Sequence, residues 1–239
     1  MSGHSKWSKV KHQKAVTDAA KGSAFTKASR AITVAVKEGG GITDPEKNYH
    51  LRLALDRARE VNMPKDTIEK AIERASSSGL ENIESLIYEG YGPGGVALLV
   101  EVATDNRNRT ASELKYAIER ADGSFASTGS VRFLFDRCGV ITISKGSHSF
   151  DQLFEIALEC GASDVVEAGE YVELYTPVQE VEAVKQKLTE KAIPIDNSLV
   201  IFRPKSFVSP GEDGAKKNEK LVQALELIDD VQKVYTNLA

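Results

Sequence analysis

The fold is decided by GVITISKGSHSFDQLFEIALECGASDVVEAGEYVELYT (139–176), the clearest succession of structural signals in this chain of 239 residues. Short apolar runs alternate here with an amphipathic run, and residues 177–202 add one more helix and strand. Ser149 is placed to cap the first helix, and Thr176-Pro177 with Gln179 to begin the second. The β-α-β-β-α-β order is that of ferredoxin-like domains. The predicted elements are a strand at 140–144, a helix at 150–160, strands at 164–167 and 171–175, a helix at 177–191 and a strand at 195–202.

The pattern of residues 1–77 predicts helices only. Between Ser23 and Glu38 the apolar residues recur at helical spacing and form one stripe, with basic residues on the opposite face. The three glycines 39–41 end this helix. Asp44 is a plausible N-cap for the second helix, with Pro45 at its first position, and the third helix starts at Pro64.

The middle of the chain begins with two predicted strands, 84–90 and 96–103, joined by a glycine-rich turn at 92–95. Thr110 and Glu113 have the spacing of a capping box and predict the start of a helix. A strand is expected at 131–135, and a last helix and strand at 217–229 and 231–235. Because that terminal pair cannot be stable alone, we expect it to return and complete the middle domain.

The predicted fold class is α+β, with an N-terminal three-helix domain and two α/β, ferredoxin-like domains. The first α/β domain is discontinuous, and the second is inserted into it. The expected boundaries are 1–78 for the helical domain, 79–138 plus 205–239 for the discontinuous domain, and 139–204 for the insertion.

Composition excludes several classes of protein. A hydrophobic content of 41% and a charged content of 28% are ordinary for a globular chain. No apolar run reaches the roughly 18 residues that a membrane span requires, and the N-terminus lacks the apolar region of a secretory signal. Cys138 and Cys160 are too few for a disulfide framework, so a reducing, cytoplasmic location is expected, with both as unreactive thiols.

Positive charge is concentrated in residues 1–37, here called the basic segment, which sum to about +7. Because the whole chain is −4, the residues that follow sum to about −11. Such a layout attracts a polyanion to one end of the molecule, and nucleic acid is its commonest partner. The basic residues are Lys6, Lys9, Lys11, Lys14, Lys21, Lys27, Arg30 and Lys37, and the one acid is Asp18.

Two further features have alternative interpretations. Arg107 and Arg109 lie next to a predicted helix N-terminus, where they could bind phosphate or form salt bridges with nearby acids. Trp7, the single tryptophan, could be a packing anchor or could stack on an unpaired base.

Nothing in the sequence predicts catalysis, a cofactor, a metal site or a small-molecule substrate. The glycine-rich turn 92–95 lacks the Gly-Lys-Ser/Thr of a phosphate-binding loop and precedes a strand, so a tight turn is expected. The four histidines are scattered, and no nucleophile motif is present. We therefore expect a protein that is not an enzyme.

Six motifs carry a resemblance: GHSKW (3–7), KHQKA (11–15), FTK (25–27), YEGYGPGG (88–95), DNRNRT (105–110) and GSVRFLF (129–135). With them the chain resembles the YebC/PmpR family of bacterial proteins, whose mitochondrial relative is a translational activator of cytochrome c oxidase. The resemblance implies a helical domain followed by two α/β domains. It also implies either a DNA-binding transcriptional regulator or a ribosome-associated factor that helps translation through difficult sequences such as proline runs.

We therefore expect a cytoplasmic, nucleic-acid-binding regulator of gene expression, with transcription favoured by the family label and a ribosome-associated translation factor as the alternative. No recognition helix is evident, and a pI of about 5.7 is low for a DNA-binding protein, so sequence-tolerant phosphate contact or RNA is physically more natural. The partner is DNA or ribosomal RNA, and no membrane is expected. The predicted nucleic-acid-binding residues are Lys6, Trp7, Lys9, Lys11, Lys14, Lys21, Lys27, Arg30, Arg107 and Arg109.

Overall fold

The computed structural model describes residues 18–76 and 83–239, with side chains in the first range from residue 22 onward. The described residues form two compact units. The inserted unit is Phe135–Lys205, and the main unit combines the described residues up to Leu134 with Ser206–Ala239. Each unit is described by itself below.

Three helices open the main unit: α2 (Asp18–Glu38), α3 (Tyr49–Glu60) and α4 (Lys65–Ser76). Their apolar stripes meet in one buried cluster that includes Ile32, Leu51 and Ala71. The glycines after α2 end it as predicted, since Gly40 and Gly41 have positive φ angles of 68° and 84°.

The expected cap of α3 is wrong. Asp44 caps a turn, and the N-cap of the helix is Asn48, four residues later, so α3 begins at Tyr49. Asn48 is buried; its Oδ1 accepts from Leu51 N–H at 3.1 Å, while its Nδ2 donates to Ala35 O and Ile42 O. A residue that caps one helix and also binds the end of another is favoured over a cap with local contacts only.

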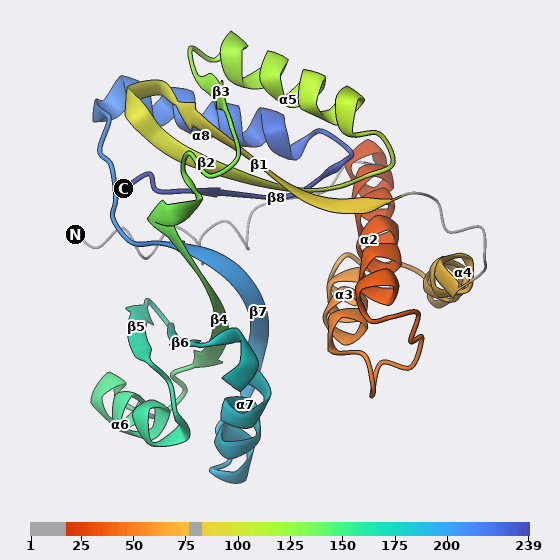
Figure 1. The fold of residues 1–239 in the computed structure, drawn as a ribbon. Helices are drawn as coiled ribbons and strands as arrows, with labels where there is room; N and C mark the ends of the chain where they lie inside the picture. The colour runs from red at the N-terminus through yellow and green to blue at the C-terminus, as the bar shows by residue number, and fades with distance from the viewer. Residues whose placement is uncertain (1–17, 77–82) are drawn as a thin grey trace. The chain divides into compact units, whose positions relative to one another are not determined.

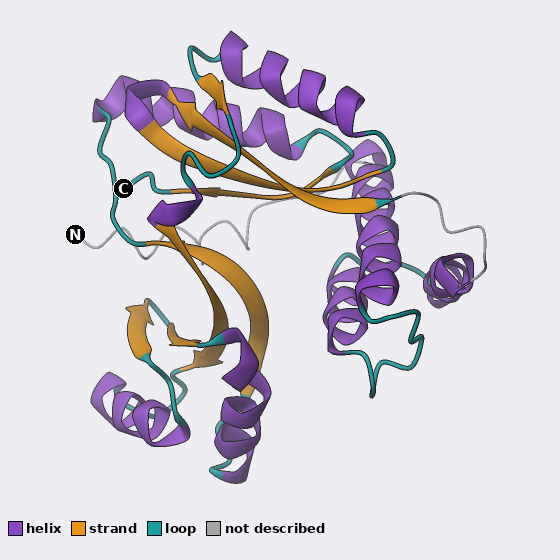
Figure 2. Ribbon diagram, in the orientation of Figure 1, coloured by secondary structure: helices purple, strands orange, loops and turns teal. Residues whose placement is uncertain are grey.

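The first sheet belongs to the main unit and has the strand order β3-β1-β2-β8, all antiparallel. Helices α5 (Arg107–Arg120) and α8 (Gly211–Glu226) lie along one face of it (Figures 1 and 2). Leu98 and Val100 of the central strand pack there against Leu114 of α5 and Leu221 of α8. The C-terminal helix and strand therefore complete the middle of the chain, as expected. The strands are β1 (Glu84–Gly92), β2 (Val96–Thr104), β3 (Ser124–Ala126) and β8 (Val231–Thr236).

Three local expectations for this region are wrong. Helix α5 begins at Arg107 behind the N-cap Asn106, so Thr110 lies inside the helix and forms no capping box. Residues 132–134 form a 3-10 turn, and the edge strand is β3 instead. Helix α8 begins at Gly211, six residues before its predicted start.

Two of the sequence motifs meet at one buried carboxylate. Glu89 of β1 accepts hydrogen bonds from the backbone N–H groups of Gly129, Val131 and Arg132, at 2.6, 2.7 and 3.0 Å. Burial alone would raise the pKa of Glu89, but these bonds hold it below its ordinary value. The YEGYGPGG motif thus anchors the loop formed by the GSVRFLF motif.

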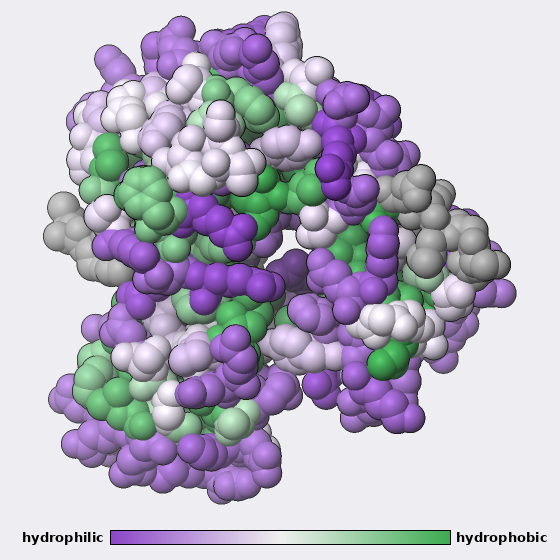
Figure 3. All heavy atoms as spheres, viewed as in Figure 1, coloured by the Kyte–Doolittle hydropathy of each residue, from purple (hydrophilic) through white to green (hydrophobic). Residues whose placement is uncertain are grey.

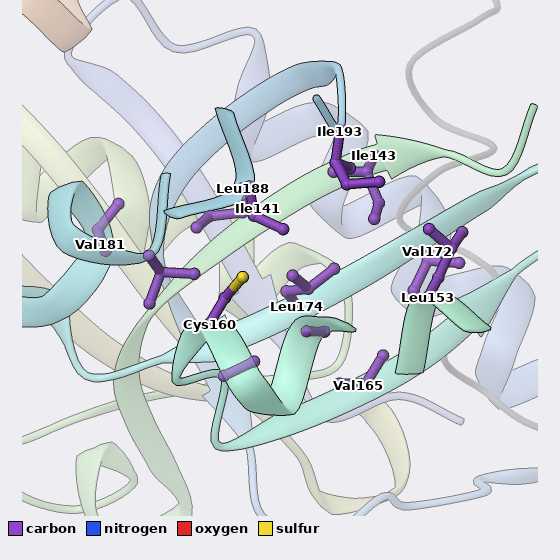
Figure 4. Packing of buried hydrophobic residues seen from close by; sticks show 13 residues of the cluster. Ile141, Ile143, Leu153, Cys160, Val165, Val172, Leu174, Val181, Leu188 and Ile193 are labelled. Atoms are coloured by element: carbon purple, nitrogen blue, oxygen red, sulfur yellow. The ribbon is translucent and has the colours of Figure 1, made fainter. Parts of the chain in front are cut away.

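The inserted unit contains the second sheet, with the strand order β5-β6-β4-β7. Helices α6 and α7 bury its apolar face; Figure 4 shows Leu153, Cys160 and Leu188 in the same cluster as Ile141 and Leu174. Its elements are β4 (Phe135–Ser144), α6 (Phe150–Cys160), β5 (Asp164–Ala168), β6 (Tyr171–Thr176), the 3-10 turn η4 (Val178–Glu180), α7 (Val181–Glu190) and β7 (Ile195–Pro204).

Ser149 forms the predicted N-cap of α6, in a complete capping box with Gln152. The second expected helix start is wrong: a 3-10 turn occupies 178–180, so α7 begins four residues after Pro177. Where α7 lies, the face seen in Figure 3 is mostly hydrophilic, as expected for a helix with one buried stripe, whereas α6 also exposes Phe154 and Leu158.

The predicted fold class is confirmed: N-terminal helices precede two antiparallel sheets, and the second sheet interrupts the sequence of the first. In the part of the chain that the structure describes, no helix is both long and apolar enough to span a bilayer. Burial raises the pKa of Cys160 above its ordinary value and that of Cys138 to about 11, which disfavours the reactive thiolates.

Candidate nucleic-acid interface

The predicted contact residues divide into two groups. Four described residues can be placed with their side chains: Lys27 and Arg30 on α2, and Arg107 and Arg109 in the first turn of α5. Lys21 lies in α2, but only its backbone is described. The others lie outside the described residues: Lys6, Trp7, Lys9, Lys11 and Lys14.

The polar face of α2 contacts the connection between α8 and β8. Ser23 Oγ donates to Asp229 at 3.0 Å, and Lys27 Nζ donates to the backbone oxygen of Glu226. Arg30, three residues further along the helix, forms an ion pair with Asp230. Spacings of three and four residues place these side chains on one face of a helix, so all three reach the same short segment, 226–230.

Asp230 is the centre of a polar network. Its side chain is only 3% exposed and accepts from Arg109 Nη2 at 2.8 Å, in addition to Arg30. The hydroxyl groups of Thr104 and Thr110 also donate to it, at 3.1 and 2.5 Å. Burial alone would raise the pKa of Asp230, but the bonds from Arg109 and Thr110 and the charge of Arg30 hold it below its ordinary value.

The two arginines of the DNRNRT motif have different surroundings. Arg109 bridges Asp105 and Asp230, and these hydrogen bonds raise its pKa above the ordinary value. Arg107 forms an ion pair with Glu84, yet 64% of its side chain remains exposed. Both make salt bridges, but the side chain of Arg107 is more exposed than that of Arg109, at 64% against 41%.

A groove between α2 and α4 has a mixed lining. Its polar residues include Ser29, Thr67 and Arg74, together with Thr33 and Arg30, which already donate to Ser29 O and Asp230. Its apolar residues are Phe25, Met63, Ala71 and Ile83, so the groove does not have the composition of a phosphate-binding surface.

Helices α3 and α4 are separated by the short turn 61–64, as in a helix-turn-helix, but α4 does not have the composition of a base-reading helix. Its basic residues are balanced by an equal number of acids. A recognition helix instead presents basic and amide side chains to the edges of the bases. The basic residues are Lys65, Lys70 and Arg74, and the acids are Asp66, Glu69 and Glu73.

Asp230 was missing from the predicted set. Its ionic partners Arg30 and Arg109 are 200 and 121 positions away in the sequence, and an acid directly before a strand carries no signal of such a role. Within ranges 18–76 and 83–239, no group of three His, Cys, Asp or Glu side chains is arranged to hold a metal ion.

Comparison with known proteins identifies the family. Residues 5–78 match the model for the TACO1/YebC protein N-terminal domain, and residues 83–238 match that for the TACO1/YebC second and third domain. A probable transcriptional regulatory protein from Chloroflexus aggregans is 44% identical over 100% of this chain and 95% of its own length. Another protein of that name, from Rubrobacter xylanophilus, is 45% identical over 99% of this chain and 95% of its own.

A solved structure agrees with these matches. The crystal structure of a conserved hypothetical protein from Aquifex aeolicus superposes with a TM-score of 0.85 at 41% identity, covering 98% of this chain and 96% of that one. Similarity of this extent in both sequence and fold spans the helices and both sheets. The chain therefore belongs to the TACO1/YebC family.

Proposed function

We propose that this protein is a nucleic-acid-binding regulator of gene expression that acts in the cytoplasm and catalyses no reaction. The observation that carries the proposal is the distribution of charge, about +7 in residues 1–37 against about −11 in the rest. The acidic remainder would repel a polyanion, so the basic segment has to supply most of the attraction.

The proposed contact residues are Arg107, as a second contact on α5, and in the basic segment Lys6, Trp7, Lys9, Lys11, Lys14 and Lys21. Lys27, Arg30 and Arg109 belong to the predicted set, but each is already engaged within the main unit. A phosphate would have to compete there with carboxylate or carbonyl oxygens. We also propose three domains: a helical domain at 1–78, a discontinuous α/β domain at 79–138 with 205–239, and an inserted domain at 139–204.

The printed names of the relatives favour a DNA-binding transcriptional regulator. The mixed charge of α4 and the low pI favour sequence-tolerant contact with phosphates instead, as on ribosomal RNA. We therefore propose transcriptional regulation first and a ribosome-associated translation factor that relieves stalling second. Crosslinking in cells followed by sequencing of the attached nucleic acid separates the two, since promoter DNA supports the first and ribosomal RNA the second.

Neutralising Lys6, Lys9, Lys11 and Lys14 to Gln tests the contribution of the basic segment. The slope of log K against log salt should flatten by about 3–4 units, at roughly 0.7–0.9 per lost phosphate contact. Fluorescence anisotropy with labelled DNA and RNA strands over a series of salt concentrations measures it.

The matched control neutralises four lysines of the inserted unit, Lys145, Lys185, Lys191 and Lys205, which changes the net charge equally. This control should leave the slope unchanged. Equal flattening in both variants would mean that net charge, and not the basic segment, sets the affinity, and an unchanged slope in the first would refute the proposal.

A further inference from the structure

The contact between α2 and segment 226–230 is made by three side chains of α2, each with its own partner. Lys27 donates to the carbonyl of Glu226, the last residue of α8. The last carbonyl groups of a helix have no hydrogen-bond partner within it and carry partial negative charge. A lysine there donates the missing hydrogen bond and offsets that charge. Ser23 and Arg30 bind the next acids along, Asp229 and Asp230.

Asp230 requires positively charged partners at this contact. A carboxylate that is 3% exposed must be paired, because an isolated buried charge is costly. Two cations meet that need from different directions, Arg30 from α2 and Arg109 from α5. Thr104 at the end of β2 donates as well. One side chain therefore joins the N-terminal helices to the sheet and to the DNRNRT motif.

We propose that Asp230 is a positioning residue that fixes α2 on the first sheet and thereby holds the part of the basic segment that lies in α2 at a set place relative to Arg107. Residues 18–37 of the basic segment belong to α2, and residues 1–17 precede it in the sequence, so the position of this helix sets the point to which they are joined. A nucleic acid long enough to reach both contacts gains affinity through effective concentration, and the gain is largest when their separation is held at a value that matches its span. This role rests on the proposed function, whereas the fixing of α2 does not.

Spin labels report the position of α2–α4 directly. Labels at Lys70→Cys on α4 and Glu113→Cys on α5 occupy exposed positions of the main unit, in a background with Cys138 and Cys160 replaced by alanine. The wild-type background should give a narrow distance distribution by double electron–electron resonance. Asp230→Asn should broaden it, because a neutral amide no longer holds two guanidinium groups.

Two further variants complete the experiment. Arg30→Gln removes only the partner on α2 and leaves Asp230 with Arg109 and both threonines, so it should fold and still broaden the distribution. Asp105→Asn removes the other acid on Arg109 and should leave the distribution narrow. A narrow distribution in both Asp230→Asn and Arg30→Gln would overturn the proposal.

Binding measurements test the functional half. Asp230→Asn should lower the affinity for a long single strand by about tenfold or more, while a short oligonucleotide that reaches only the basic segment should bind equally well. Equal loss for both lengths would overturn the positioning role. If wild-type protein bound neither strand, the proposed function would fail, and the spin-label distances would still decide whether Asp230 fixes α2.

Discussion

At the scale of single residues, Asp230 decides how the basic side chains near it are used. A carboxylate accepting from two arginines and two threonines is satisfied, and its donors are held in fixed positions. Arg109 therefore has a structural task regardless of any ligand. Arg107, two residues earlier, is paired only at the surface with Glu84, so its side chain can exchange partners at little cost.

Separate Gln substitutions of these arginines should have different consequences. Arg109→Gln should lower the free energy of unfolding by about 1–3 kcal/mol, less than a fully broken buried pair, because Arg30 and the threonines still satisfy Asp230. Arg107→Gln should cost less than about 1 kcal/mol and should weaken association with a large partner instead. Urea unfolding measures the loss of stability, and cosedimentation with ribosomes measures the loss of association. A larger loss of stability in Arg107→Gln than in Arg109→Gln would contradict our interpretation.

At the scale of elements, Glu89 explains how the loop 129–134 is held against β1. Three N–H groups of residues 129–132 point at one carboxylate that is 2% exposed. Tyr91, two residues along β1, also donates to Ser130 O at 2.9 Å. The loop is therefore fixed to β1 by side chains from the strand, although it contains only a single 3-10 turn of its own.

Glu89→Gln should destabilise the protein by about 2–4 kcal/mol, because a neutral amide loses charge-assisted bonds and leaves one N–H donor facing its own NH₂ group. The folded-state pKa of Glu89 is below its ordinary value of 4.5, so its stabilisation is present above about pH 4.5 and is lost as the pH falls through the lowered pKa. Urea unfolding between pH 7 and pH 3 measures both effects.

The control for this prediction is Glu119→Gln, an exposed acid on α5. It should match the wild type in both stability and pH dependence. If Glu89→Gln lost stability on acidification as steeply as the wild type, the buried carboxylate would not be the group responsible.

At the scale of the whole molecule, the chain leaves the first sheet, builds a second unit and returns. The return is required because β8 pairs with residues 98–102 of β2 and completes one edge of the sheet, and Leu221 and Leu225 of α8 are buried in the cluster on its face. The insertion leaves and re-enters through neighbouring strands, since Phe135 of β4 pairs with Pro204 of β7. Termini this close are typical of inserted units that can fold independently.

Truncation after residue 205 should therefore expose the apolar side of the first sheet and cause aggregation. The excised fragment 135–205 should fold alone and melt cooperatively. Analytical ultracentrifugation and thermal unfolding of both fragments measure this. A soluble 1–205 chain with a cooperative transition would contradict the discontinuous topology.

The sequence by itself determined the features that arise from local chemistry. Helical periodicity located α2 and α6, Ser149 with Gln152 marked a helix start, and the unpaired helix and strand at the C-terminus implied their return to the first sheet. The charge of residues 1–37 is likewise a property of composition. Periodicity, caps and charge depend on residues within a few positions of one another, so they can be recognised in a single chain.

Only the tertiary structure decided which polar groups meet. Thr110 has the spacing of an N-cap, but its hydroxyl binds Asp230, and Asn106 caps the helix one turn earlier. Asn48 displaced Asp44 as a cap in the same way, by also binding the backbone near the end of α2. In each case local spacing offered more than one cap, and the one observed goes with hydrogen bonds that form only in the folded chain, to Asp230 for Thr110 and to Ala35 and Ile42 for Asn48.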